Sequence, residues 1–247
     1  MHNHRLINCT DSWDDDAVWV LNALIRRSIQ SSGICNLMLT GGKSAAKIYR
    51  NSKLFDGISA QKLKIFIGDE RCVDSSHTNS NYALVERELQ ASGRLEHYSV
   101  EKIIGDGADY DLMAEEYSSL LPHSIDILLL SLGLDGHIAS IFPGDRSIHT
   151  ETKLLTLSQS HHHPHKRITI SPLVIQRAGC TVLLAVGSEK GQILLDALQK
   201  TSNPIDYPVQ LLLNKNSIWL LDQAAANKLK TLERVNIETI EKYYGHF

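Results

Sequence analysis

The chain has 247 residues, a net charge of −3 and 43% hydrophobic residues. This is the composition of a globular protein with a core of its own, and without a long basic run nothing suggests nucleic acid as a partner. No apolar stretch reaches the length of a membrane span or resembles a signal peptide. The four cysteines are widely spaced without a C-x-x-C pair, which favours free thiols. We therefore expect a cytoplasmic protein with no nucleic-acid or membrane partner.

Helical and strand-like apolar patterns alternate along the chain. The first helix is expected over residues 11–30, with Thr10 or Asp11 as its cap and Gly33 as its stop. Further helices are expected over residues 43–51, 79–90, 110–121 and 188–199, and from residue 222 onward. Strands are expected over residues 34–40, 63–67, 125–132, 167–170, 181–186 and 217–221. This alternation predicts one α/β domain over residues 1–247, with a doubly wound, mostly parallel sheet and helices on both faces.

One loop, from Gly133 to Gly144, combines glycines with side chains suited to proton transfer. It follows a short aliphatic strand, and open α/β sheets bind ligands at the carboxyl ends of such strands. Asp135 and His137 carry the carboxylate and the imidazole. An Asp-Gly turn with a solvated histidine is the alternative. Asp135 either orients the imidazole or only shapes the turn.

Three more polar segments follow predicted strands, at residues 41–44 (GGKS), 69–71 (DER) and 187–190 (GSEK). The carboxyl ends of parallel strands share one edge, so all four segments are expected in one cleft. Residues 41–44 do not form a P-loop, because Leu37 stands where its first glycine is needed. Their Gly-Gly turn either presents backbone N–H groups to an anion or simply reverses the chain. Arg167 and Lys190 are either phosphate ligands or surface charges.

The least regular segment, residues 145–166, contains histidines at positions 161–163 and 165. They are too close in sequence to surround one metal ion, and no acidic or thiolate partner lies near them. We therefore expect a solvated loop, with no metal and no cofactor. Its position after the central loop makes a flap over the cleft a hypothesis.

Five motifs in order give a resemblance to a known family. They are residues 39–42 (LTGG), 68–73 (GDERCV) with 80–82 (SNY), 133–144 (GLDGHIASIFPG), 167–169 (RIT) and 187–190 (GSEK). Together they resemble the 6-phosphogluconolactonases, a group related to the glucosamine-6-phosphate deaminases. The resemblance runs from about residue 34 to about residue 225.

The resemblance implies hydrolysis of a phosphorylated sugar lactone, with a sugar phosphate as the small-molecule partner. It implies His137 as general base and places Arg71 in the substrate site, and we take Asp135 as their catalytic companion. The residues expected to bind substrate and phosphate are Gly41, Gly42, Lys43, Ser44, Asp69, Arg167 and Lys190. No metal or cofactor is expected, and the chain is expected to be a monomer or a weak homo-oligomer.

The chain departs from the family pattern in two loops. Lys43-Ser44-Ala45 replaces the usual Ser/Thr-Pro, which adds a charge near the expected phosphate site, and Asp74 replaces a proline. The related deaminases carry a glutamate where this chain has Phe142, and a phenyl ring cannot transfer protons. Two alternatives stay open: an amino-sugar-phosphate deaminase or isomerase, and a sensing module that binds sugar phosphates without catalysis.

Overall fold

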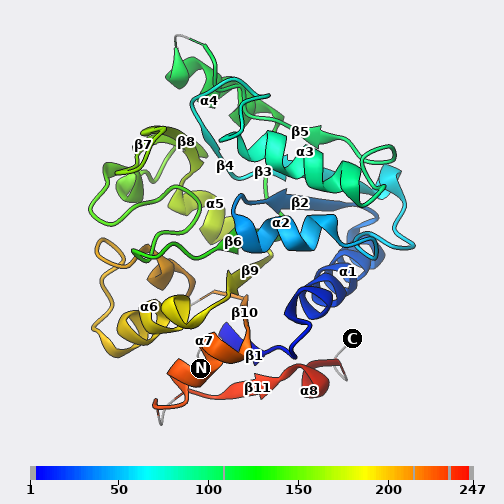
Figure 1. The fold of residues 1–247 in the computed structure, drawn as a ribbon. Coiled ribbons are helices and arrows are strands. Elements are labelled where there is room, and N and C mark those ends of the chain that lie inside the picture. Colours follow the sequence, from blue (N-terminus) through cyan, green and yellow to red (C-terminus); the bar gives the residue numbers. More distant parts are fainter. Residues whose placement is uncertain (1–3, 108, 214, 233–234, 245–247) are drawn as a thin grey trace.

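The computed structural model describes residues 4–107, 109–213, 215–232 and 235–244. Within them, eight strands form one sheet in which every neighbouring pair is parallel (Figure 1). In spatial order the strands are β11 (Ile237–Thr239), β1 (His4–Asn8), β10 (Ser217–Leu221), β9 (Cys180–Ala185), β6 (Ile127–Ser131), β2 (Cys35–Leu39), β3 (Leu63–Ile67) and β5 (Val100–Glu101). This confirms the mostly parallel α/β class. The strands β1, β5 and β11 were not predicted.

The strand order reverses at the centre of the sheet. From β2 the chain adds β3 and β5 on one side, and from β6 it adds β9 and β10 on the other. The neighbours β2 and β6 therefore flank the switch point, where the loops that leave the two strands diverge and leave room for a ligand.

The helices connect the strands largely as expected. They are α1 (Trp13–Ser32), α2 (Lys43–Arg50), α3 (Asn81–Ala91), α4 (Tyr110–Leu120), α5 (Pro172–Arg177), α6 (Ser188–Gln199), α7 (Gln223–Leu229) and α8 (Ile240–Tyr244). Gly33 ends α1 with φ 83°, a conformation that favours glycine. The predicted start is wrong: Ser12 is the N-cap, and the Thr10 hydroxyl donates to Asp16 instead. No described helix is long and apolar enough to cross a membrane.

A second, antiparallel sheet lies beside the first. It consists of β4 (Asp69–Arg71), β8 (Lys166–Ile170) and β7 (Leu155–Gln159), with β8 in the middle. Residues 167–170 form a strand, as predicted, but it belongs to this second sheet. The segment 145–166, expected to be the least regular, contains β7 and a short 3-10 helix at Arg146–His149.

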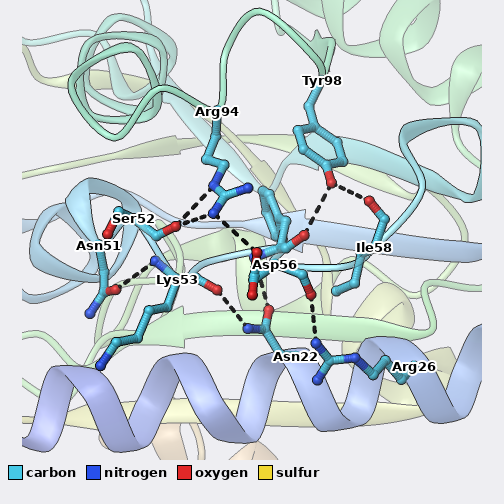
Figure 2. A network of polar contacts seen from close by, with 10 residues as sticks. Asn22, Arg26, Asn51, Ser52, Lys53, Asp56, Ile58, Arg94 and Tyr98 are labelled. Carbon is cyan, nitrogen blue, oxygen red and sulfur yellow. Dashed lines mark hydrogen bonds and ion pairs between the residues drawn. The ribbon is translucent and has the colours of Figure 1, made fainter.

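Side chains hold the connection between α2 and β3, which has little regular structure (Figure 2). Asn22 of α1 donates to the Lys53 carbonyl at 2.8 Å and accepts from the Phe55 amide at 2.9 Å. The Tyr98 hydroxyl donates to the Ile58 carbonyl at 2.5 Å, and Arg94 donates to the Ser52 carbonyl. These polar groups therefore bind the loop itself, which explains their presence without a ligand.

Candidate active site

A cleft of about 580 Å³ opens at the switch point of the large sheet. Eight of the ten residues predicted for the site line it: Gly41, Gly42, Asp69, Arg71, Asp135, His137, Arg167 and Lys190. The other two, Lys43 and Ser44, begin α2 and are not part of the lining. The four polar segments thus converge: Asp69 and Arg71 follow the parallel strand β3 after Gly68, but they stand on a strand of the small sheet.

His137 and Asp135 form a hydrogen-bonded pair in this cleft. The Nδ1 atom of His137 lies 2.5 Å from Oδ1 of Asp135, which also accepts from the His137 amide at 3.2 Å. Since a carboxylate only accepts, Nδ1–H is the donor and Nε2 is left free to take a proton. Burial acts to raise the pKa of Asp135, but the bond to His137 and its charge outweigh burial and lower it to about 2.

The backbone of the loop fits closely around the imidazole. A Cβ on Gly133 would lie 2.0 Å from Nδ1 of His137, so only glycine allows the ring to sit there. Gly136 has φ 89°, which again favours glycine. The Phe142 ring packs against the imidazole with centroids 4.7 Å apart. An apolar ring therefore lies beside His137.

Arg71 and Arg167 stand directly opposite each other on β4 and β8. Within the described part of the chain, neither guanidinium forms an ion pair with a carboxylate. Burial and the charge of Arg71 lower the pKa of Arg167 to about 10, and Nε of Arg71 is buried without a hydrogen-bond partner. Like charges directly opposite destabilise a sheet, so this pair favours an anionic ligand.

The adjacent acids Asp69 and Glu70 have different surroundings. Glu70 is buried and accepts from the Ser80 hydroxyl and from the amides of Asn81 and Tyr82 at the start of α3. Burial raises its pKa in spite of these bonds. Asp69 lines the cleft and accepts from the Ser140 hydroxyl at 2.6 Å through one oxygen, while the other oxygen has no partner. Glu70 therefore holds the fold, and Asp69 is the acid of this pair that lines the cleft.

The Gly-Gly turn after β2 packs closely against the side chain of Asn81. A Cβ on Gly41 would lie 1.9 Å from Oδ1 of Asn81, so glycine is required there. Asn81 is buried and lines the cleft, with its Nδ2 donating to the Asp69 carbonyl. Gly42, with φ 103°, is the N-cap of α2. The turn is thus closely packed as well as open to the cleft.

Lys190 approaches the cleft from the first turn of α6. Burial lowers its pKa, and the Asp135 carboxylate acts in the opposite direction. The next residue, Gly191, lies where α6 meets α7: an added Cβ would be 2.6 Å from the Ala225 carbonyl. A larger residue would push α6 away, so this packing sets the position of Lys190.

Sequence reasoning did not assign several polar residues of the lining. They are Asn79, Asn81, Ser131, Ser140, Ser160, His162 and His163. Asn81 and Ser140 belong to motifs that were quoted, but neither carries a charge that would have pointed to it. His162 and His163 were expected in a solvated loop. Among the described residues, no group of three or more His, Cys, Asp or Glu side chains is arranged to hold a metal ion.

The fold and the site define an α/β protein with a polar cleft at its switch point, and both an imidazole–carboxylate pair and an arginine pair line this cleft. The chain belongs to the family described as glucosamine-6-phosphate isomerases/6-phosphogluconolactonase, whose sequence model matches residues 11–220.

One relative and two solved structures are similar to this chain. The chain is 30% identical over 220 residues to a probable 6-phosphogluconolactonase of Arabidopsis thaliana, covering 80% of this chain and 84% of the relative. The structure of a 6-phosphogluconolactonase from Trypanosoma brucei is 25% identical, with a TM-score of 0.76, covering 92% of this chain and 98% of that one. A monomeric glucosamine-6-phosphate deaminase has a TM-score of 0.72 at 19% identity, covering 91% and 99%. The fold therefore does not separate lactonase from deaminase.

Proposed function

We propose that this protein hydrolyses 6-phospho-D-glucono-1,5-lactone to 6-phosphogluconate without a metal ion, using His137 as general base. One observation carries the proposal: the His137–Asp135 pair and the Arg71–Arg167 pair, which lacks a carboxylate partner, line the same cleft. The first suits proton transfer and the second suits an anionic substrate. The names of the relatives support the choice of a sugar-phosphate lactone.

In the proposed mechanism, Nε2 of His137 takes a proton from water while Asp135 holds the Nδ1–H. The hydroxide formed attacks the carbonyl carbon of the lactone. The tetrahedral oxyanion then collapses, the bond from that carbon to the ring oxygen breaks, and His137 returns the proton to the departing oxygen. No covalent intermediate is required.

Arg71 is the donor that we assign to the oxyanion. The amides of Gly133 and Gly136 donate inside their own loop, to the carbonyls of His137 and Gly133. They are therefore already used, whereas Arg71 lines the cleft and forms no ion pair with a carboxylate of the described residues. Arg167 and Lys190 are left for the phosphate, with Asp69 accepting from a sugar hydroxyl.

Phe142 favours lactone hydrolysis over deamination. The ring is buried against His137, at the position where the resemblance places the glutamate of the deaminases. A phenyl ring supplies no proton for opening an amino sugar or releasing ammonia. The Asp135–His137 pair in turn favours an enzyme over a sensing module, since binding alone does not require it.

The test is turnover of freshly prepared 6-phosphogluconolactone, coupled to a dehydrogenase that consumes the product acid and corrected for spontaneous hydrolysis. We expect protein-dependent turnover and no ammonia from glucosamine 6-phosphate. Ammonia release would favour the deaminase, and saturable binding of 6-phosphogluconate without turnover would favour the sensor. Location in the cytoplasm and a monomeric or weakly associated state stay predictions.

A further inference from the structure

The loop between β7 and β8 brings histidines to the cleft. His162 and His163 line the cleft together with Arg167 and Lys190. His161 and His165 instead line a neighbouring hollow beside Phe142 and are not part of the cleft lining. The histidine cluster is therefore divided between the site and its surroundings, which gives a control position within the same loop.

Hydrogen bonds within the loop assign the protons of two of these rings. Nδ1 of His165 lies 3.0 Å from the Ser160 carbonyl, which only accepts, so this nitrogen carries a proton. In the neutral ring, Nε2 of His165 is then an acceptor, and Nε2 of His163 donates to it at 2.9 Å. Nδ1 of His163 remains to take a second proton, which leaves the bond to His165 intact.

Three cationic side chains line the cleft with the two histidines: Arg167 from β8, Arg71 from β4 and Lys190 from α6. In the described part of the chain none of them forms an ion pair, although the charge of Asp135 acts on Lys190 and that of Asp69 on Arg167. The acids of the lining are Asp69, already bonded to Ser140, and Asp135, already bonded to His137. His137 is the remaining titratable imidazole of the lining. The phosphate of a ligand would thus place negative charge beside these cationic side chains.

We propose that His162 and His163 bind the phosphate of the substrate, and that their protonation strengthens this binding as the pH falls from 8 to 6. The inference rests on the proposed function, because it takes the phosphate to lie at Arg167. Imidazole changes charge between about pH 5 and 8, and a protonated ring donates a charge-assisted hydrogen bond to phosphate. As the pH rises, the positive charge is lost, and with it the added affinity.

The test measures the dissociation constant of 6-phosphogluconate by calorimetry at pH 6 and pH 8. The variant is His162→Gln with His163→Gln, and His161→Gln is the control from the same loop. Gluconate serves as the matched ligand without phosphate. The phosphate itself titrates near pH 6, but this affects every variant equally and cancels in the ratio to the unmodified protein.

We expect the double variant to bind 6-phosphogluconate about tenfold more weakly at pH 6 and less than about twofold more weakly at pH 8. Gluconate binding and the His161→Gln protein should not change. Equal loss at both pH values, no loss, or the same loss in the control would overturn the proposal. If the double variant does not fold, each single substitution provides the same comparison. A lack of lactone turnover by the unmodified protein would count against the proposed function and not against this pH-dependent binding.

Discussion

The two walls of the cleft come from two different sheets. The parallel sheet contributes loops at the ends of β2, β6 and β9, and one of them holds the His137–Asp135 pair. The antiparallel sheet contributes the bodies of its strands, on which Arg71 and Arg167 stand opposite each other. A loop can fit its backbone closely around one side chain, as the loop after β6 does around His137. The antiparallel pairing of β4 and β8 instead fixes two charged residues opposite each other. In the proposed function, proton transfer belongs to the first wall, and the phosphate is bound by Arg167 of the second wall together with Lys190, which follows β9.

Removing the imidazole should have the largest effect. The substitution His137→Ala takes away the proposed base, so kcat for 6-phosphogluconolactone should fall by about 10²- to 10⁴-fold. Steady-state kinetics on the fresh lactone measure this, and an unchanged melting temperature shows that the loop still folds. A nearly normal kcat in this variant would show that His137 is not the general base.

The next effect distinguishes the two roles left open for Asp135. In Asp135→Asn the Oδ1 atom can still accept from the His137 amide, so the turn is kept, but the negative charge is lost. If the carboxylate orients and stabilises the imidazole, kcat should fall by about 10- to 100-fold. An unchanged kcat would mean that Asp135 only shapes the turn.

The pH behaviour of this carboxylate follows from the same pair. The pKa of Asp135 is lowered to about 2, below the value of about 3.9 expected in the unfolded chain. Its ionised form therefore stabilises the folded loop above that unfolded value, and this contribution is lost as the pH falls through 2. Between pH 4 and 9, we expect no step in activity from Asp135 itself, which a pH–rate profile of the two proteins would check.

Arg167→Met tests the antiparallel wall. It should raise KM for the phosphorylated lactone by about tenfold or more, while plain gluconolactone is hydrolysed as before. The free protein should not lose thermal stability, because the change removes one of two like charges held opposite each other. Arg177→Met, at the exposed end of α5, is the matched control. An equal rise in KM for both lactones would contradict a phosphate role.

The two walls were not equally predictable from the sequence. Alternating apolar segments and glycines indicated β2, β6 and β9 with the loops that follow them, since strands buried on both faces are continuously apolar. The strand β4 is only Asp69-Glu70-Arg71, and three charged residues give no strand signal. Without β4 and β7, the register that pairs Arg71 with Arg167 could not be foreseen. The same holds for Asn81 and His162, which reach the cleft only through tertiary packing.

The smallest expected effect is that of removing metal ions. His163 and His165 are close enough to share a proton, and together they offer two nitrogen ligands, fewer than the three or four protein ligands of typical zinc sites. The proposed mechanism uses water activated by His137 alone. Treatment with EDTA followed by gel filtration should therefore leave kcat and KM for the lactone unchanged. Strong inhibition by EDTA that added zinc reverses, and that is absent in His163→Gln, would contradict this expectation. It would mean that the histidine loop between β7 and β8 binds a metal ion needed for activity.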